Sequence, residues 1–305
     1  MTVVALAIAA SVAAGVVAER RWGERAQRAS RGAIAALLWV VLPFITFFTL
    51  ARLEITTGVG AGLGLAFVEL AIVGLAAWVL ATRVLGLPRP STGALIVVVV
   101  LANTGYLGVP LNGALLGHDD LGPAIAFDTV VSGPMFYVVG FAVGAIFGAA
   151  AGDTTGQRLR SFVVRNPPLV ALVAALLAPD ALAPDALVDV ATVLVYAVLP
   201  VGFFVLGVNL AAEAEDGALP FPPPFGPPVA AALGLRLLAA PALMLAFSLA
   251  VVRLPDAYLV QAAMPSGINS LVVAHAYGLD LRLTSAVLAW STGIVVAVAL
   301  AVAAL

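Results

Sequence analysis

The sequence contains no cysteine and no lysine, and charged residues make up only 10% of its 305 positions. Without cysteine there is no disulfide, no thiol nucleophile and no thiolate-bound zinc or iron–sulfur centre. All 14 basic residues are arginine, and none forms a basic run interleaved with aromatic residues. That distribution excludes a nucleic-acid-binding surface. We expect neither a cofactor nor a metal ion.

Hydrophobic residues, by contrast, make up 63% of the chain. A soluble domain carries about 25% charged residues, so a soluble core could not bury this much apolar surface. The bilayer is therefore the predicted solvent. Crossing it takes about 20 apolar residues per helix. About ten segments qualify, at 2–18, 32–50, 58–82, 91–116, 122–149, 167–183, 186–210, 229–252, 255–277 and 283–304.

The arginines predict the orientation of these segments. Eleven of them follow odd-numbered segments, two follow even-numbered segments, and Arg236 lies inside the eighth. Because cytoplasmic loops are enriched in basic residues, both termini are predicted to face outward from a multi-pass protein of the inner or plasma membrane. In the first segment the arginines follow the apolar stretch, which is the reverse of signal-peptide order.

A short internal repeat divides the chain into two halves. Val41–Pro43 and Phe47–Phe48 lie in the second segment, and Val198–Pro200 and Phe203–Phe204 lie in the seventh. The Val-Leu-Pro copies are 157 residues apart. Because five segments separate the copies, the second half enters the membrane from the opposite side. Inverted repeats of this kind are the architecture of many secondary transporters.

Two apolar segments contain helix-breaking residues, and these breaks are also five segments apart. Asn103–Leu111 lies in the fourth segment and Met264–Ser270 in the ninth. The sequence thus predicts an all-α polytopic membrane protein with about ten transmembrane helices. They would form two inverted five-helix repeats, 1–150 and 151–305, with two broken crossover helices.

The breaks also predict a binding site, because unpaired backbone groups in lipid cost several kcal/mol. Half-helix N-termini favour a carboxylate and half-helix C-termini favour a cation. A proline kink used only for packing is the alternative. The predicted substrate-binding residues are Asn103, Thr104, Gly105, Gly108, Pro110, Pro265, Ser266, Gly267, Asn269 and Ser270.

These motifs resemble those of the auxin efflux carrier family of bacterial permeases. Asn-Thr-Gly-x-x-Gly-x-Pro-Leu at 103–111 is similar to its fourth-span motif, and Met-Pro-Ser-x-x-Asn-Ser at 264–270 to its ninth. The resemblance implies a ten-span fold with scaffold and transport subdomains, related to bile acid:sodium symporters. It also implies organic-anion substrates, such as dicarboxylates or auxin, and an elevator-like cycle.

Ionisable residues inside the membrane are candidates for ion coupling. Asp128 could carry a proton or bind a cation, or could simply bond a neighbouring helix. His275 titrates near physiological pH and could gate proton-linked transport, or could lie at the cytoplasmic mouth. Sodium-coupled relatives use a Glu and a Gln in the ninth span, where this chain has Gln261 alone. Arg236 could meet a substrate carboxylate, pair with Asp128 or snorkel toward the cytoplasm.

The predicted function is therefore secondary active transport of small organic anions, and the protein is not expected to be an enzyme. A sodium-coupled organic-anion importer is the first alternative. An intramembrane hydrolase is the lesser one, because Gly278–Asp280 and Ser266–Gly267 each lack a glycine of the relevant protease motifs. The expected partners are the organic anion, the lipid bilayer, and a proton or sodium ion. The sequence is compatible with a homodimer but does not determine the oligomeric state.

Overall fold

The computed structural model describes residues 2–50, 60–117, 121–150, 152, 154–179, 182–215, 223 and 225–302. Its regular secondary structure is helical, and one isolated backbone bridge joins Ala102 and Ser266. The α-helices are α1 (Thr2–Trp22), α2 (Glu24–Ala36), α3 (Leu42–Leu50), α4 (Gly60–Val79), α5 (Arg89–Val100), α6 (Val109–Leu115), α7 (Leu121–Phe127), α8 (Phe141–Phe147), α9 (Thr155–Val164), α10 (Pro167–Leu177), α11 (Asp185–Glu215), α12 (Pro227–Leu233), α13 (Ala240–Ala250), α14 (Asp256–Ala262), α15 (Asn269–Tyr277) and α16 (Leu281–Val302).

Short π-helical segments join several of these helices into longer rods. They are Leu37–Val41, Leu80–Val84, Thr104–Gly108, Asp128–Ser132, Met135–Gly140 and Gly234–Ala239. Within the described ranges, five rods are long and apolar enough to cross a membrane, at Glu24–Phe48, Gly60–Val84, Gly122–Phe147, Pro227–Ala250 and Leu281–Val302. The chain is therefore a polytopic helical membrane protein, as its composition predicts.

Each predicted apolar segment overlaps one rod or one pair of helices, but a connection in mid-chain differs from expectation. The sequence predicts only a connection between the segments 122–149 and 167–183, whereas the structure forms α9 there. The Thr154 hydroxyl accepts a hydrogen bond from Gln157 N, and the Gln157 side chain accepts one from Thr154 N. This capping box satisfies backbone donors at the helix start. The Thr-x-x-Gln spacing is the local signal that indicates this helix.

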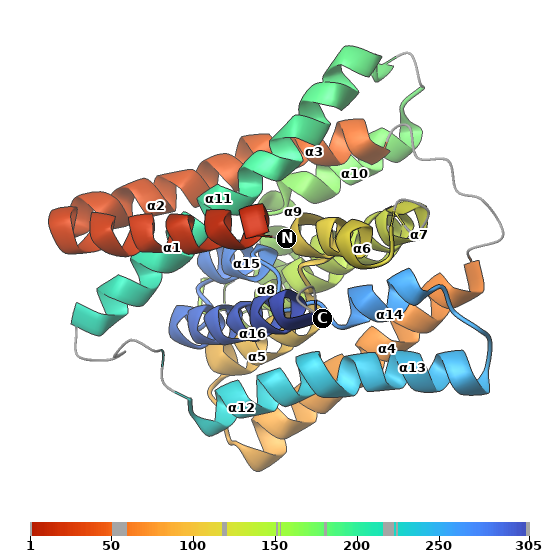
Figure 1. Ribbon diagram of the computed structural model, residues 1–305. Helices are drawn as coiled ribbons and strands as arrows, with labels where there is room; N and C mark the ends of the chain where they lie inside the picture. The colour runs from red at the N-terminus through yellow and green to blue at the C-terminus, as the bar shows by residue number, and fades with distance from the viewer. Residues whose placement is uncertain are drawn as a thin grey trace.

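The helices gather into two groups on either side of the broken segments. Figure 1 shows α1, α2, α3, α10 and α11 along one side of the molecule, and α4, α12 and α13 along the opposite side. α1 packs extensively on α11, and α10 on α3. The first pair is close enough for backbone contact, because a Cβ on Gly15 or Gly207 would overlap backbone atoms of the opposite helix.

Burial follows the expectation for a protein surrounded by lipid. Every residue of α5 from Ser91 to Val100 is buried, because other helices surround it. Large apolar side chains such as Leu75, Leu238 and Leu249 are instead exposed on the outer helices. Lipid tails can solvate such residues, so their exposure is consistent with a membrane-embedded surface.

Candidate functional site

The two broken segments cross at the centre of the molecule and pair with each other through their backbones. α5 ends at Val100 and α14 ends at Ala262, and each is followed by a short non-helical stretch before the chain becomes helical again. Asn103 N donates to Pro265 O at 2.8 Å, and Gly267 N donates to Leu101 O at 2.6 Å. Each break thus satisfies polar groups freed by the other. We call this region, 101–108 with 263–270, the crossing.

Glycine is needed at two positions of the crossing because the chains approach so closely. A Cβ on Gly267 would lie 2.9 Å from the carbonyl oxygen of Ala102, a backbone atom that cannot move alone. A Cβ on Gly108 would collide with the side-chain oxygen of Gln261. These two contacts give a physical reason for the glycines that the sequence singled out.

Several buried polar side chains at the crossing have no hydrogen-bond partner among the described residues. Asn103 is 2% exposed, and neither its Oδ1 nor its Nδ2 is paired. The same holds for the hydroxyl of buried Ser270 and for Oδ1 of half-buried Asn269. A buried amide without a partner costs about 1–3 kcal/mol. Such groups are therefore candidates for contact with a bound molecule.

A carboxylate from another helix also reaches the crossing. The Thr104 hydroxyl donates to Asp128 Oδ1 at 2.5 Å. The Asp128 carboxylate lies so close to Gly105 that a Cβ there would be 2.9 Å from Oδ2. Tyr106 and Tyr137 are near enough to interact electrostatically with Asp128. Of the two ionisable candidates for coupling, Asp128 is the one that the structure brings to the crossing.

Gln261 is buried at the end of α14 and links the crossing to a neighbouring helix. Its Nε2 donates to Ala124 O at 2.9 Å and to Thr104 O at 3.3 Å. Its Oε1 has no partner in the described part of the chain. The amide nitrogen of Gln261 is therefore bonded, whereas its amide oxygen is available as an acceptor at the crossing.

Three other predicted residues either bond the backbone of a helix or lie outside the crossing. The Ser266 hydroxyl donates to Val98 O at 2.7 Å, so it caps α5. Pro110 lies in the first turn of α6, two residues beyond the crossing. His275 lies in the last turns of α15, where its Nδ1 is 2.9 Å from Leu271 O of the same helix. The structure does not bring His275 to the crossing.

Arg236 corrects the sequence-based interpretation. Snorkelling toward the cytoplasm, one of its predicted roles, is wrong, because the side chain is 1% exposed and donates to backbone carbonyls inside the molecule. No ion pair or hydrogen bond joins it to Asp128 or another carboxylate within the described ranges. The sequence reading also missed Glu69, a buried acid in α4, and Asn112, a buried amide in α6. A lone acid in an apolar segment is the signal that marks Glu69.

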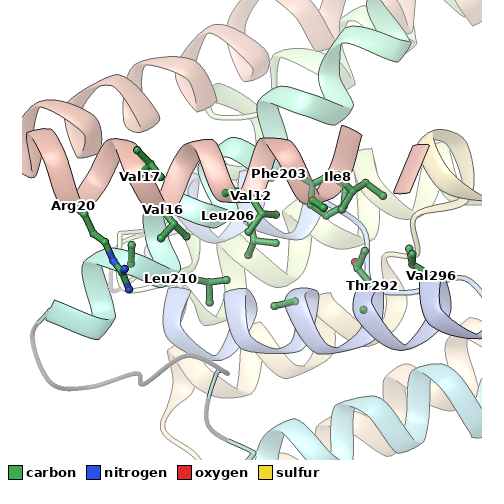
Figure 2. Close-up of a pocket in the computed structure, with 15 residues that line it drawn as sticks. Ile8, Val12, Val16, Val17, Arg20, Phe203, Leu206, Leu210, Thr292 and Val296 are labelled. Carbon is green, nitrogen blue, oxygen red and sulfur yellow. The ribbon is translucent and has the colours of Figure 1, made fainter. Parts of the chain in front are cut away.

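An apolar groove of about 630 Å³ lies beside the crossing, between α1, α11 and α16. Figure 2 shows Arg20 extending from α1 at one end of the groove, near Leu210, with Ile8 and Thr292 toward the other end. Phe203, which lines the groove, belongs to the same apolar cluster as Ile268 of the crossing. The groove therefore adjoins the crossing through shared packing.

Apolar rods that can cross a bilayer define a polytopic membrane protein, and its two helices that break and pair inside the protein are of the kind found in secondary transporters. Residues 162–303 match the family described as membrane transport protein. An uncharacterized transporter of Methanocaldococcus jannaschii is 25% identical over 261 residues, which cover 81% of this chain and 80% of that protein. Both matches bear out the resemblance to the auxin efflux carrier permeases that the motifs indicate.

Proposed function

We propose that the protein is a secondary active transporter of small organic anions, such as carboxylates or auxin-like acids, bound at the crossing. The observation that carries this proposal is the pair of unpaired amide atoms on buried Asn103. The chain resumes its helical course just after Asn103 and again at Asn269, so two half-helix N-termini flank these amides. Helix N-termini and amide N–H groups both favour an anion.

We further propose that the architecture consists of two inverted five-helix repeats, 1–150 and 151–305. The packing between the two halves supports this architecture, because the first segment of each half packs on the second segment of the other. The first segment of the first half, α1, packs on the second segment of the second half, α11. Conversely, α10 packs on α3. The two breaks occupy equivalent places in the halves. Such repeats are typical of carriers that work by alternating access, and an elevator-like movement of one helix group against the other fits the separation of the groups in Figure 1.

The groove supports a substrate with an apolar body. Its walls are mostly aliphatic, and Arg20 is the one cation among the described residues that line it. An organic acid entering from that end would meet a positive charge first and apolar walls next. Because arginines predominate on the side predicted to be cytoplasmic, we propose entry from the cytoplasm, both termini outside, and a location in the inner or plasma membrane.

A sodium-coupled organic-anion importer is the second candidate. The observation in its favour is Gln261, which lies at the crossing with an unpaired acceptor oxygen. An intramembrane hydrolase gains no support, because the hydroxyl of Ser266 is bonded to Val98 O and not to a histidine.

A thermal-shift screen of organic acids against the purified protein tests the proposal. Any ligand that binds the folded state raises its melting temperature by mass action. The screen is run at two pH values, with and without sodium, on the natural chain and on Asn103→Ala. Gly64→Ala is the matched control, because Gly64 is exposed and no atom of the described residues lies within 4 Å of an added Cβ. We expect acids that stabilise the natural chain and Gly64→Ala but not Asn103→Ala. Equal shifts in all three proteins would place the binding site elsewhere.

A further inference from the structure

One guanidinium connects the two half-helices that end at the crossing. Arg236 lies in the π-helical segment Gly234–Ala239, between α12 and α13, and is 1% exposed. Its Nη1 donates to Val99 O at 3.0 Å, and its Nη2 donates to Ala262 O. Val99 is in the last turn of α5, and Ala262 is the last residue of α14. The side chain therefore binds the C-terminal carbonyls of both half-helices.

The C-terminal backbone carbonyls of these two half-helices attract positive charge. The last carbonyls of a helix lack intrahelical partners, and the C-terminus carries about half a negative charge. Here two such ends converge in the protein interior. In carriers with broken helices, ends of this kind coordinate the coupling sodium ion or proton. In this chain a permanently charged side chain is bonded to both of them.

A buried acidic side chain lies near enough to the arginine to interact with it electrostatically. Glu69 of α4 is 1% exposed, and its two carboxylate oxygens have no hydrogen-bond partner among the described residues. When ionised it is attracted to Arg236, although no hydrogen bond joins the two among the described residues. An uncompensated charge is costly at membrane depth. The acid and the two carbonyl ends together therefore provide the negative surroundings that a monovalent cation requires.

We propose that the C-terminal ends of α5 and α14, together with Glu69, form a monovalent-cation site that the chain fills with its own Arg236 guanidinium. The consequence for coupling rests on the proposed transport function. A cation that is covalently part of the protein neither binds nor dissociates during the cycle, so substrate movement at the crossing does not need sodium. This inference distinguishes the protein from the sodium-coupled importer considered above.

The test uses purified Arg236→Ala in detergent, without any transported substrate. Its melting temperature is measured against millimolar guanidinium chloride, sodium chloride and choline chloride at matched ionic strength. We expect the variant to melt several degrees below the natural chain. Guanidinium should restore at least half of that loss in a saturable manner, sodium should restore less, and choline nothing. The natural chain and Arg253→Ala, which alters an exposed arginine outside the site, should show no such response.

A second pair of variants covers the case in which Arg236→Ala does not fold. Arg236→Met leaves Glu69 without its counter-charge, whereas Arg236→Met combined with Glu69→Gln removes both charges. The double variant should be the more stable of the two. A guanidinium-insensitive Arg236→Ala, or a double variant no more stable than Arg236→Met, would overturn the cation site. Sodium-dependent uptake by the natural chain would overturn the coupling consequence alone. Because the titration needs no substrate, failure of the proposed transport function would leave its result intact.

Discussion

Replacing Gly267 with alanine should separate the two broken segments. Gly267 does not have a positive φ, so the backbone conformation does not oppose alanine and only space does. The new Cβ would lie 2.9 Å from the oxygen and 3.1 Å from the carbon of the Ala102 carbonyl, and 3.2 Å from the oxygen of Leu101. All three are backbone atoms, so relief requires one segment to move away from the other.

That movement endangers the two hydrogen bonds of the crossing, from Asn103 N to Pro265 O and from Gly267 N to Leu101 O. Each buried backbone group left unpaired costs about 1–3 kcal/mol. Losing both bonds leaves two backbone N–H donors unpaired, and these alone should lower the free energy of unfolding by about 2–6 kcal/mol. Binding of any acid identified in the thermal-shift screen should fall with it, because the same movement displaces Asn103.

The assay is thermal melting of the purified protein in detergent, with Gly64→Ala as the control. Alanine in place of glycine inside a helix is favoured by about 0.5–1 kcal/mol, and nothing obstructs it at position 64. We expect Gly64→Ala to melt at or above the temperature of the natural chain and Gly267→Ala well below it. A Gly267→Ala protein that melts with Gly64→Ala would refute the paired geometry of the crossing.

Two further predictions concern proton coupling, and both are measured as uptake of an identified acid into proteoliposomes with and without an imposed pH gradient. Asp128→Asn keeps an acceptor for the Thr104 hydroxyl but removes the titratable group, so uptake should lose its response to the gradient while acid exchange continues. A gradient response that survives would remove Asp128 as the proton carrier. His275→Gln should retain both rate and gradient response, because the ring contacts its own helix and not the crossing. A lost response there would transfer the coupling role to His275.

The sequence predicts the location of the breaks well, because proline, glycine and asparagine act locally on the backbone. Pro110 and Pro265 mark the fourth and ninth segments, and the structure pairs the chain beside them. Segment boundaries follow from apolar length in the same way. The repeat of Val-Leu-Pro is a weaker signal, but it identifies α3 and α11, the helices on which α10 and α1 pack.

The partners of charged side chains could not be predicted, because they depend on tertiary packing between distant segments. Arg236 bonds carbonyls that are 137 and 26 residues away in the chain, and a backbone carbonyl leaves no trace in composition. The role of Ser266 is hidden for the same reason, since its hydroxyl bonds Val98 O. The π-helical segments are also not evident from periodicity, because they displace a helical pattern by a single residue.

The central claim, that the crossing is the substrate site, is tested most directly by Asn103→Leu. Leucine has the same branching and the same number of heavy atoms as asparagine but no polar atoms, so the backbone bond to Pro265 is kept while two unpaired buried atoms are removed. The variant should be as stable as the natural chain or more stable, by up to about 3 kcal/mol.

Transport activity of the variant should fall, although its stability does not. A hydrogen bond to a charged group contributes about 1.5–3 kcal/mol, so its loss should weaken acid binding and uptake into proteoliposomes by about 10-fold or more. The measurement is uptake of the identified acid by Asn103→Leu, made on protein whose melting temperature is recorded in the same preparation. Normal stability with uptake reduced at least tenfold is the predicted result. Normal stability with unchanged uptake would contradict the assignment of the crossing as the transport site.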